Sequence, residues 1–538
     1  MEERTVSRRA VLAAGALGAA GAAGLAGCSG GGAGSQGSPR ATGSTGAAPS
    51  ASVSASPSPG SPKPADWAGL AQDLDGQLIR PGDARYAAAG RLFQPQYDTL
   101  RPQGVAYPGH AEDVAACLAF ARRYGLPVAA RSGGHSYAGW SSGSGLVIDV
   151  SRLAGVSGDA AGARVGAGAR LIDVYTGLAA AGVTVPAGSC PTVGVAGLTL
   201  GGGIGVTGRA YGLTCDSLTA AEVVTADGRI RTADASSEPD LFWALRGGGG
   251  GNFGIVTSFS FRTHPAADCS YAFLSWPWSK AVAVIAAWQA WAPTAPDALW
   301  ADLHLLVWAD GRTQLGSTVT YLGPKDELAD LIDRLAVAPT APKLHTASYL
   351  ATMQAMGGVS GYSQAASHLP GSLPGQDPAG RVPRESYGAK SDVFTRPIDD
   401  AGARALVAAV ERYPRTGPQG GSAGVAFDAL GGAINRVGAG DTAFVHRDGL
   451  FTAQYTANFP PGVTGGTDAD RSWSWLDGVW TAMRPYASGQ AYQNYVDPRL
   501  DGWEQAYYGA NAARLRSVKR TYDPNGLFRF PQAVPLGG

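Results

Sequence analysis

The sequence predicts an α+β protein built from two main domains. The chain has 538 residues, more than one ordinary domain holds, and its hydrophobic content of 45% is enough for a core of that size. Short helical patterns alternate with short apolar runs from Asp66 to about Pro265, whereas longer strand patterns dominate from Cys269 onward. We therefore expect a first domain over residues 66–268 and a second α+β domain, with an antiparallel sheet, over residues 269–486.

Residues 1–28 are predicted to be an export signal and not part of the fold. Ser7-Arg8-Arg9-Ala10-Val11-Leu12 matches a twin-arginine signal, and an uncharged Ala/Gly/Leu stretch runs from Ala10 to Gly27. This stretch ends in Leu25-Ala26-Gly27-Cys28, which resembles a bacterial lipoprotein cleavage box with Cys28 as the lipidated residue. A membrane-spanning anchor is the alternative, but so much Gly and Ala makes a poor span. We expect twin-arginine export and an extracytoplasmic protein, lipid-anchored to the outer face of the cell membrane.

Residues 29–64 are predicted to be a disordered linker. The segment is rich in Gly, Ser, Ala and Pro, its only charges are Arg40 and Lys63, and Val53 is its only large aliphatic residue. Such a segment buries too little apolar area to offset the entropy lost on ordering.

The first domain is expected to mix helices with short strands. Glu112 to Tyr124 is predicted to be a helix, because its apolar residues recur with helical spacing. Asp227-Gly228, between two apolar runs, predicts a β-hairpin. The other expected elements are a helix over Leu171 to Ala181 and strands over Leu126 to Ala130, Leu146 to Val150, Ala221 to Thr225, Arg229 to Thr232 and Gly254 to Arg262.

Glycines gather in loops between these elements, over residues 133–145, 194–212 and 247–254. The chain has 78 glycines, about twice the usual share. The second loop contains Gly203-x-Gly205-x-x-Gly208, the spacing of a dinucleotide-binding Rossmann motif. No predicted strand runs directly into it, and no acidic residue stands in the ribose-binding context, so we reject that interpretation. We expect loops whose backbone wraps a large ligand.

The second domain is expected to contain long antiparallel strands. The predicted strands are Leu299 to Trp308, Gln314 to Tyr321, Gly424 to Leu430 and Leu450 to Phe459, and the predicted helices are Ala281 to Trp291 and Asp326 to Ala336. A long polar loop from Gly371 to Ser386 is expected to contribute to a pocket rim.

Charge and cysteine content exclude some classes of partner. The 42 basic and 42 acidic residues cancel, so we expect no binding to nucleic acid or to an acidic membrane surface. Cys117 is expected in the core, on the helix predicted around it. Cys215 and Cys269 could pair outside the cell, and the sequence leaves that open.

Two motifs of seven residues each place a nucleophile on a glycine-rich loop. Arg131-Ser132-Gly133-Gly134-His135-Ser136-Tyr137 puts a lone histidine in a glycine turn after an apolar run, and Gly188-Ser189-Cys190-Pro191-Thr192-Val193-Gly194 puts a lone cysteine before a proline. Each residue by itself is often structural, since a buried cysteine is usually a small hydrophobe. Together, an imidazole and a thiol on loops built for close backbone approach are suited to covalent attachment of a cofactor. Arg131 adds donors suited to phosphate.

These motifs resemble the twin attachment loops of the berberine-bridge-enzyme-like flavoproteins, a branch of the vanillyl-alcohol-oxidase superfamily. Tyr492-Gln-Asn-Tyr495-Val-Asp-Pro498 and Tyr522-Asp-Pro-Asn-Gly-Leu-Phe528 resemble the C-terminus of the same family. The resemblance implies a two-subdomain FAD-binding domain of the PCMH type and a substrate domain whose sheet covers the flavin. It also implies that residues 487–538 return to complete the FAD-binding domain.

The resemblance further implies a cofactor set. FAD would be attached bicovalently, through His135 to the flavin 8α-methyl and through Cys190 to flavin C6, and no metal is implied. The cofactor-binding residues it implies are Arg131, Ser132, Gly133, Gly134, His135, Ser136, Cys190, Val193, Gly194, Gly197, Gly201, Gly202, Gly205, Gly254, Val256, Tyr492 and Asn494. In relatives the position of Val193 gates oxygen, and a small valine there is typical of oxidases.

Three residues are implied to be catalytic: Tyr495 as general base, Gln454 on a substrate-domain strand facing that base, and Tyr137 as a pocket-lining partner. An unperturbed tyrosine has a pKa near 10, so a base at neutral pH needs its phenolate stabilised by groups that are near in space. Tyr495 could instead be a core aromatic residue and Gln454 a solvated strand residue.

The resulting prediction is an FAD-linked oxidoreductase acting on CH–OH donors. It would remove a hydride from a small-molecule alcohol, a sugar or a secondary metabolite, and reduce O2 to H2O2. One alternative is a flavin dehydrogenase that passes electrons to a membrane carrier, and another is a flavin-binding protein without turnover. Membrane contact is expected only through the N-terminal lipid anchor. Neither the substrate nor the oligomeric state follows from the sequence.

Overall fold

The computed structural model describes residues 60–537, so the predicted export signal and most of the predicted linker lie outside the described residues. The description begins at the end of that linker, where α2 (Pro64–Asp73) starts at a proline. Across residues 60–537, no helix is both long enough and apolar enough to cross a bilayer.

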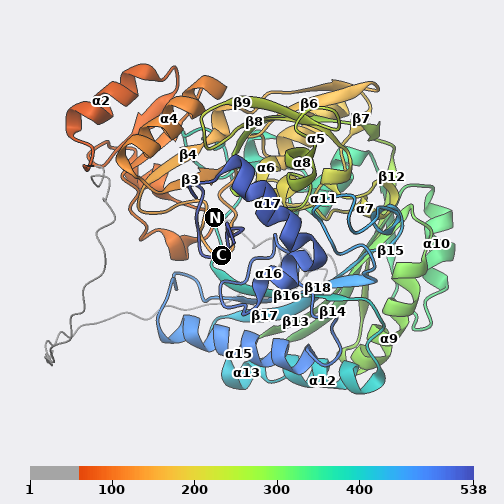
Figure 1. Ribbon diagram of the computed structural model, residues 1–538. Coiled ribbons are helices and arrows are strands. Elements are labelled where there is room, and N and C mark those ends of the chain that lie inside the picture. Colours follow the sequence, from red (N-terminus) through yellow and green to blue (C-terminus); the bar gives the residue numbers. More distant parts are fainter. Residues whose placement is uncertain (1–59, 538) are drawn as a thin grey trace, which may run out of the picture.

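The predicted FAD-binding domain contains two larger sheets and a two-stranded sheet of β7 (Val183–Thr184) and β11 (His264–Pro265) (Figure 1). The first has the order β1-β2-β4-β3, with parallel pairing of β4 to β2 and to β3. Its strands are β1 (Gln77–Ile79), β2 (Gly104–Tyr107), β3 (Val128–Arg131) and β4 (Leu146–Asp149), and its helices α2, α3 (Tyr86–Gly90) and α4 (Ala111–Tyr124). Cys117 is fully buried on α4, as predicted.

The second sheet of this domain is antiparallel, with the order β5-β6-β10-β8-β9. Its strands are β5 (Val156–Asp159), β6 (Gly162–Gly166), β8 (Leu218–Val224), β9 (Ile230–Asp234) and β10 (Ile255–Phe261). The helices that accompany it are α5 (Leu171–Ala179), α6 (Val195–Leu200), α7 (Gly208–Tyr211) and α8 (Pro239–Ala244). The predicted hairpin at Asp227-Gly228 joins β8 to β9, and Gly228 has a φ of 84°. Gly203 follows α6 and not a strand, which agrees with rejecting the Rossmann motif.

The second domain is a seven-stranded antiparallel sheet with the order β15-β12-β14-β13-β17-β18-β16. Its strands are β12 (Cys269–Trp276), β13 (Leu299–Trp308), β14 (Thr313–Tyr321), β15 (Lys343–Ala347), β16 (Tyr387–Phe394), β17 (Ser422–Ala429) and β18 (Phe451–Asn458). Helices α9 (Ala281–Trp291), α10 (Lys325–Asp333), α12 (Asp400–Val410), α13 (Tyr413–Thr416) and α15 (Thr467–Met483) lie on the side of the sheet away from the FAD-binding domain (Figure 1).

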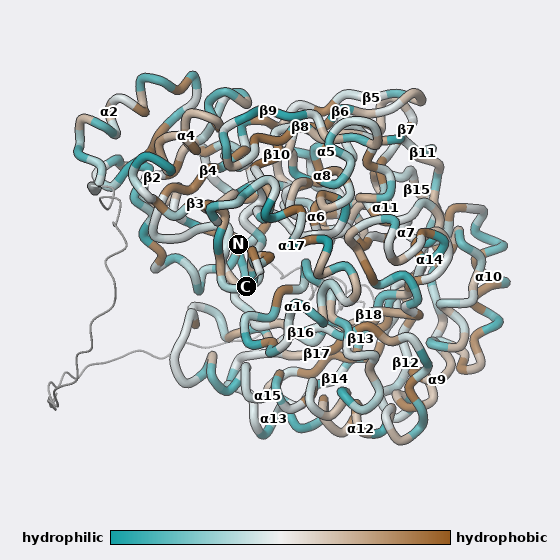
Figure 2. Tube along the Cα trace, viewed as in Figure 1, coloured by the Kyte–Doolittle hydropathy of each residue, from teal (hydrophilic) through white to brown (hydrophobic). Residues whose placement is uncertain are grey.

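Alternation along the strands divides this sheet into an apolar face and a more polar face. On β13, Leu299, Leu303 and Leu305 are fully buried in the core under the helices. The residues between them point the other way, toward the FAD-binding domain, because successive strand side chains alternate between faces. Hydrophobic residues follow the inner strands, and hydrophilic residues are frequent in the outer loops (Figure 2). The polar face is therefore available to form a site between the domains.

The C-terminal segment returns to the FAD-binding domain, as the resemblance implied. Its helices are α16 (Trp503–Tyr508) and α17 (Ala512–Tyr522), and α17 packs against α8 (Figure 1). Lys519 of α17 is buried and donates to the carbonyl of Asn252 at 2.7 Å, in the third glycine-rich loop. The end of the chain thus stabilises a loop that lies more than two hundred residues earlier. The predicted domain boundaries at 268 and 486 remain a prediction.

Arg209 is a buried link between the two domains. Its guanidinium donates to the carbonyls of Leu299 at 2.8 Å and Pro293 at 2.9 Å, and also to those of Ala295 and Leu430. Because this one guanidinium donates hydrogen bonds to several backbone carbonyls of the substrate domain, it fixes the position of that domain relative to α7.

Candidate active site

A cavity of about 660 Å³ lies between the FAD-binding domain and the polar face of the substrate sheet. This volume is within the range of about 300–1,000 Å³ found for small-molecule and cofactor sites. Every predicted site residue except Gly201 and Gly202 lines it. The predicted loop over residues 371–386 also reaches its wall, through Val382, Pro383 and Glu385.

Gly201 and Gly202 were predicted to bind the cofactor, but they do not line this cavity. A Cβ on Gly201 would lie 2.0 Å from Oδ1 of Asn494, and one on Gly202 would lie 2.6 Å from the ring of Phe444. Both glycines are therefore needed for close packing behind the cavity wall, where a larger residue would not fit.

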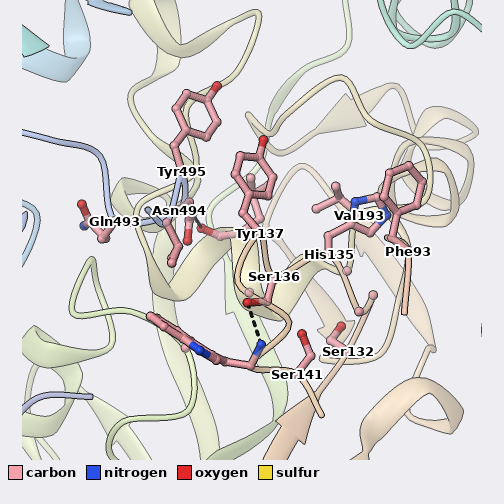
Figure 3. A pocket seen from close by; sticks show the side chains of 18 of the residues that line it. Phe93, Ser132, His135, Ser136, Tyr137, Ser141, Val193, Gln493, Asn494 and Tyr495 are labelled. Carbon is pink, nitrogen blue, oxygen red and sulfur yellow. Dashed lines mark hydrogen bonds between the residues drawn. The ribbon is translucent and has the colours of Figure 1, made fainter. Parts of the chain in front are cut away.

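The histidine loop and the cysteine loop touch each other. A Cβ on Gly133 would lie 2.2 Å from the backbone nitrogen of Gly194, so only glycine permits this approach. His135 bridges the same two loops, because its Nε2 shares a hydrogen bond of 3.0 Å with Oγ1 of Thr192. Its ring also stacks on Phe93 with centroids 4.0 Å apart (Figure 3). The structure thus holds the imidazole against Thr192, which lies two residues after Cys190 on the cysteine loop.

Cys190 differs from the other cysteines of the described residues. Its thiol is free and partly exposed on the cavity wall. Cys117, Cys215 and Cys269 are also free thiols, but they are buried, and burial raises the pKa of Cys117 to about 12 and that of Cys269 to about 11. A nucleophilic role suits Cys190 alone among these four, because the thiolate is the reactive form and needs access to its target.

The prediction that Arg131 binds phosphate is not supported by its geometry. Its Nε donates to the Asp149 carboxylate at 2.5 Å and its Nη2 donates to the carbonyl of Ala89 at 2.7 Å. The side chain is buried, and among the described residues Nε and Nη2 have partners while Nη1 has none. Arg131 therefore stabilises the junction of β3 and β4 beneath the histidine loop.

The three residues predicted to be catalytic come together on one side of the cavity. The Tyr495 ring is parallel to the Tyr137 ring, with centroids 5.8 Å apart and an interplanar angle of 4°, and both hydroxyls point to the same side (Figure 3). Gln454 of β18 donates from Nε2 to the Tyr137 hydroxyl at 2.8 Å. The amide therefore contacts the neighbour of the predicted base, and Tyr137 links the amide to Tyr495.

The segment that carries Tyr495 is fixed by its three preceding residues. The Tyr492 hydroxyl accepts hydrogen bonds from the backbone nitrogens of Gly203 at 3.0 Å and Ile204 at 3.3 Å, and from Asn494 at 2.9 Å. Gln493 donates to the carbonyl of Gly247 at 2.6 Å, and Asn494 donates to that of Leu198 at 3.0 Å. Burial raises the pKa of Tyr492 to about 12, so Tyr492 stays neutral and serves as a structural residue while Tyr495 faces the cavity.

Among the cavity residues that were not predicted from the sequence are Asp302, His304 and Asp428. His304 Nε2 lies 2.9 Å from the Asp302 carboxylate, and Asp302 and Asp428 are directly opposed on β13 and β17. Burial raises the pKa of Asp428 to about 7, and the charge of Asp302 adds to this effect. The signal was a charged residue at alternating positions of strands already predicted, since such positions must face a polar cavity or solvent.

The cavity walls fit FAD. Backbone at Gly133, Gly194, Gly197 and the 249–251 loop forms one side, and a Cβ on Gly197 would meet no atom within 4 Å, so the wall there is open to a ligand. Such exposed backbone lets a pyrophosphate approach N–H groups closely, and the stacked His135 and the Cys190 thiol supply groups that can bond to carbon. The residues that would hold FAD are thus the two attachment loops and the glycine-rich wall.

Two sequence families match the chain. The family described as FAD binding domain matches residues 102–234, and the family described as Berberine and berberine like matches residues 491–535. The FAD-linked oxidoreductase YgaK of Bacillus subtilis is 34% identical over 471 residues, which cover 86% of this chain and 97% of that protein.

Solved structures share the fold. The wild-type berberine-bridge-enzyme-like protein 1 of Physcomitrella patens superposes with a TM-score of 0.75 at 29% identity, covering 87% of this chain and 98% of that one. Glucooligosaccharide oxidase from Acremonium strictum, whose FAD is described as 6-S-cysteinyl and 8α-N1-histidyl, superposes with a TM-score of 0.75 at 26% identity over 87% of this chain and 98% of that one.

Proposed function

Because the chain belongs to the berberine and berberine-like family of FAD-linked oxidoreductases, we propose that it is an oxidase acting on a CH–OH group of a sugar or a secondary metabolite. The substrate would lose a hydride and a proton to become the carbonyl compound, and O2 would take up both electrons and two protons to become H2O2. One observation carries this proposal: a tyrosine cluster, a histidine and a partly exposed cysteine from segments far apart in sequence line one cavity.

FAD, when bound, supplies a two-electron acceptor that O2 can reoxidise. The tasks left to the protein are holding the cofactor, orienting the alcohol and accepting the hydroxyl proton. We propose that His135 and Cys190 hold FAD by two covalent bonds, like the 6-S-cysteinyl, 8α-N1-histidyl FAD of the Acremonium oxidase. The hydrogen bond between His135 Nε2 and Oγ1 of Thr192 holds the imidazole against the loop that carries Cys190.

Tyr495 is the proposed proton acceptor. Stacking on Tyr137 and an edge contact with Tyr492, at centroid distances of 5.8 and 4.9 Å, fix its ring so that its hydroxyl points away from the loop that carries it (Figure 3). Asp428 is a second proposed acceptor in the same cavity. Burial raises its pKa to about 7, so both its protonated form and its accepting carboxylate form are populated near neutral pH. A substrate hydroxyl hydrogen-bonded to either group would lose its proton as the hydride leaves.

A cavity-lining valine supports reaction with O2. Val193 lies beside His135 on the wall (Figure 3), and a small side chain there leaves room for a diatomic molecule. Electron transfer to a membrane carrier would serve a lipid-anchored protein equally well. The two are separated by measuring H2O2 release and acceptor reduction with the same substrate.

The test of the base is Tyr495→Phe, which keeps the ring and its stacking and removes the hydroxyl. Anaerobic flavin reduction by a panel of sugars and phenolic alcohols, followed by absorbance, should slow by about a hundred- to ten-thousand-fold in this variant. Covalent FAD should persist, because His135 and Cys190 are unchanged. If Tyr495→Phe reduces flavin at the wild-type rate, Tyr495 is not the base.

A further inference from the structure

Asp302, His304 and Asp428 form a charged cluster on the cavity face of the substrate sheet. Asp302 and His304 lie on β13 on the same face, and Asp428 is the direct partner of Asp302 across the β13–β17 pairing. All three line the cavity. Directly opposed strand residues have Cβ atoms about 4.5–5.5 Å apart, so the two carboxyls act on each other strongly.

The two carboxyls have very different surroundings. Asp302 is buried, its Oδ1 accepts from the backbone nitrogen of Thr318 at 2.5 Å, and its Oδ2 lies 2.9 Å from His304 Nε2. The Asp428 carboxyl makes no hydrogen bond with any residue in the described range 60–537, and Asp428 lines the cavity. Burial raises the pKa of this carboxyl to about 7.

The groups around Asp428 have opposite effects on that proton. Asp302 repels the Asp428 carboxylate and so favours its protonated form, whereas a charged His304 favours the carboxylate. On its other side, β18 presents Thr452, which does not titrate. Tyr387, Tyr495 and Glu385 line the same cavity from other segments.

We propose that Asp302 and His304 are a positioning pair that sets the pH at which Asp428 releases its proton into the cavity. The pair is placed to act on Asp428 because Asp302 is its direct cross-strand partner. The consequence for turnover rests on the proposed function, since Asp428 is useful as an acceptor only if an alcohol is oxidised here. The effect on the proton of Asp428 does not rest on it.

The structure sets the direction and size of the effect. The unprotonated fraction of Asp428 rises as pH rises through about 7, so the rate of any step that uses it as acceptor rises over the same range. Two unit charges at this spacing, with an effective dielectric constant of about 20, alter the midpoint by about two pH units. Asp302→Asn should therefore lower the midpoint by at least about one unit, and His304→Gln should raise it.

The experiment is a direct titration of Asp428 in the FAD-loaded protein. The protonated carboxyl is followed by infrared difference spectroscopy and identified by its loss in Asp428→Asn. Asp302→Asn retains an acceptor for the Thr318 nitrogen, and His304→Gln retains a donor for Asp302, so both preserve the local hydrogen bonds. Asp310→Asn is the matched control, because it removes an exposed carboxylate from the hairpin that joins β13 to β14.

The expected result is opposite shifts in the two variants and none in the control. Equal midpoints in wild type and Asp302→Asn, or shifts of the same sign in both variants, would overturn the proposal. If Asp302→Asn does not fold, a rise in His304→Gln supports the proposal and an unchanged midpoint refutes it. The pH profile of flavin reduction should move with the midpoint. Should the midpoint move while the rate profile stays fixed, the positioning role stands and the use of Asp428 as proton acceptor fails.

Discussion

Replacing Gly194 with alanine is expected to separate the two attachment loops. The added Cβ would lie 2.1 Å from Oγ of Ser132 and 2.2 Å from the backbone nitrogen of Gly133. Ser132 can rotate, but the Gly133 backbone cannot. Carbon contacts are favourable only at about 3.5 Å and beyond, so the loops must move apart by about 1 Å. Overpacking of this kind costs about 1–3 kcal/mol of stability.

The larger effect should be on covalent attachment. His135 and Thr192 stand on opposite loops, so a separation of about 1 Å breaks their 3.0 Å hydrogen bond and turns the imidazole away from its present orientation. Misplacement by about 1 Å costs about a hundredfold in steps that depend on alignment. Apoprotein mixed with FAD should therefore form its flavin bonds about a hundred times more slowly in Gly194→Ala, measured as colour retained after denaturation.

Gly478→Ala is the control for the glycine replacement itself. Gly478 lies within α15, and a Cβ there would meet no atom within 4 Å, so helix stability should rise by up to about 1 kcal/mol with no effect on attachment. If Gly194→Ala attaches FAD at the wild-type rate and unfolds at the wild-type temperature, the loop contact is not what orients His135.

Two further predictions concern attachment and export. Denatured wild-type protein should stay yellow and carry flavin on two peptides, His135→Ala and Cys190→Ala should each retain one bond, and the double variant should lose its colour; free FAD released from denatured wild type would disprove this. Changing both Arg8 and Arg9 to lysine should hold folded, flavin-bearing protein in the cytoplasm, and Cys28→Ser should prevent lipidation, as read from cell fractionation and the mass of the N-terminal peptide; a wild-type protein that starts downstream of Cys28 and carries no lipid would contradict the anchor.

The sequence patterns predicted some of the elements, and they failed at β16, where charges are buried. The strand over Leu299 to Trp308 was predicted with the bounds of β13. β16 was not predicted, since it carries Lys390 and Asp392 in its middle. The structure buries both, with Lys390 donating to Asp497 at 2.8 Å and Asp392 paired with Arg484. When the partner of a buried charge lies about a hundred residues away, the neighbouring sequence does not indicate that the charge is buried, and the strand cannot be predicted from it.

The site residues that lie in short motifs could be predicted from the sequence. Those that only strand pairing brings together could not. The histidine and cysteine loops and the Tyr492 segment are short stretches whose residues occupy the cavity wall together. Asp302 and Asp428 are 126 positions apart, and only the pairing of β13 with β17 opposes them. Arg131 shows the reverse case, because its place in a motif predicted a ligand contact, whereas the structure pairs its Nε with the buried Asp149.

Tyr492 and Tyr495 belong to one motif, but their surroundings indicate a structural role for Tyr492 and a chemical role for Tyr495. The variant Tyr492→Phe tests this difference. The Tyr492 hydroxyl is the acceptor for two backbone N–H groups and for Asn494, and all lie in a buried or partly buried setting. Leaving a buried donor without its partner costs about 1–3 kcal/mol, so losing this acceptor should cost at least that and lower the melting temperature. Tyr495→Phe should leave the melting temperature near wild type, because its hydroxyl faces the cavity, and should slow flavin reduction instead. Measuring both quantities in both variants separates a structural tyrosine from a chemical one. If Tyr492→Phe is as stable as wild type, the 198–204 loop does not depend on the Tyr492 hydroxyl, and the C-terminal segment does not stabilise the site through this contact.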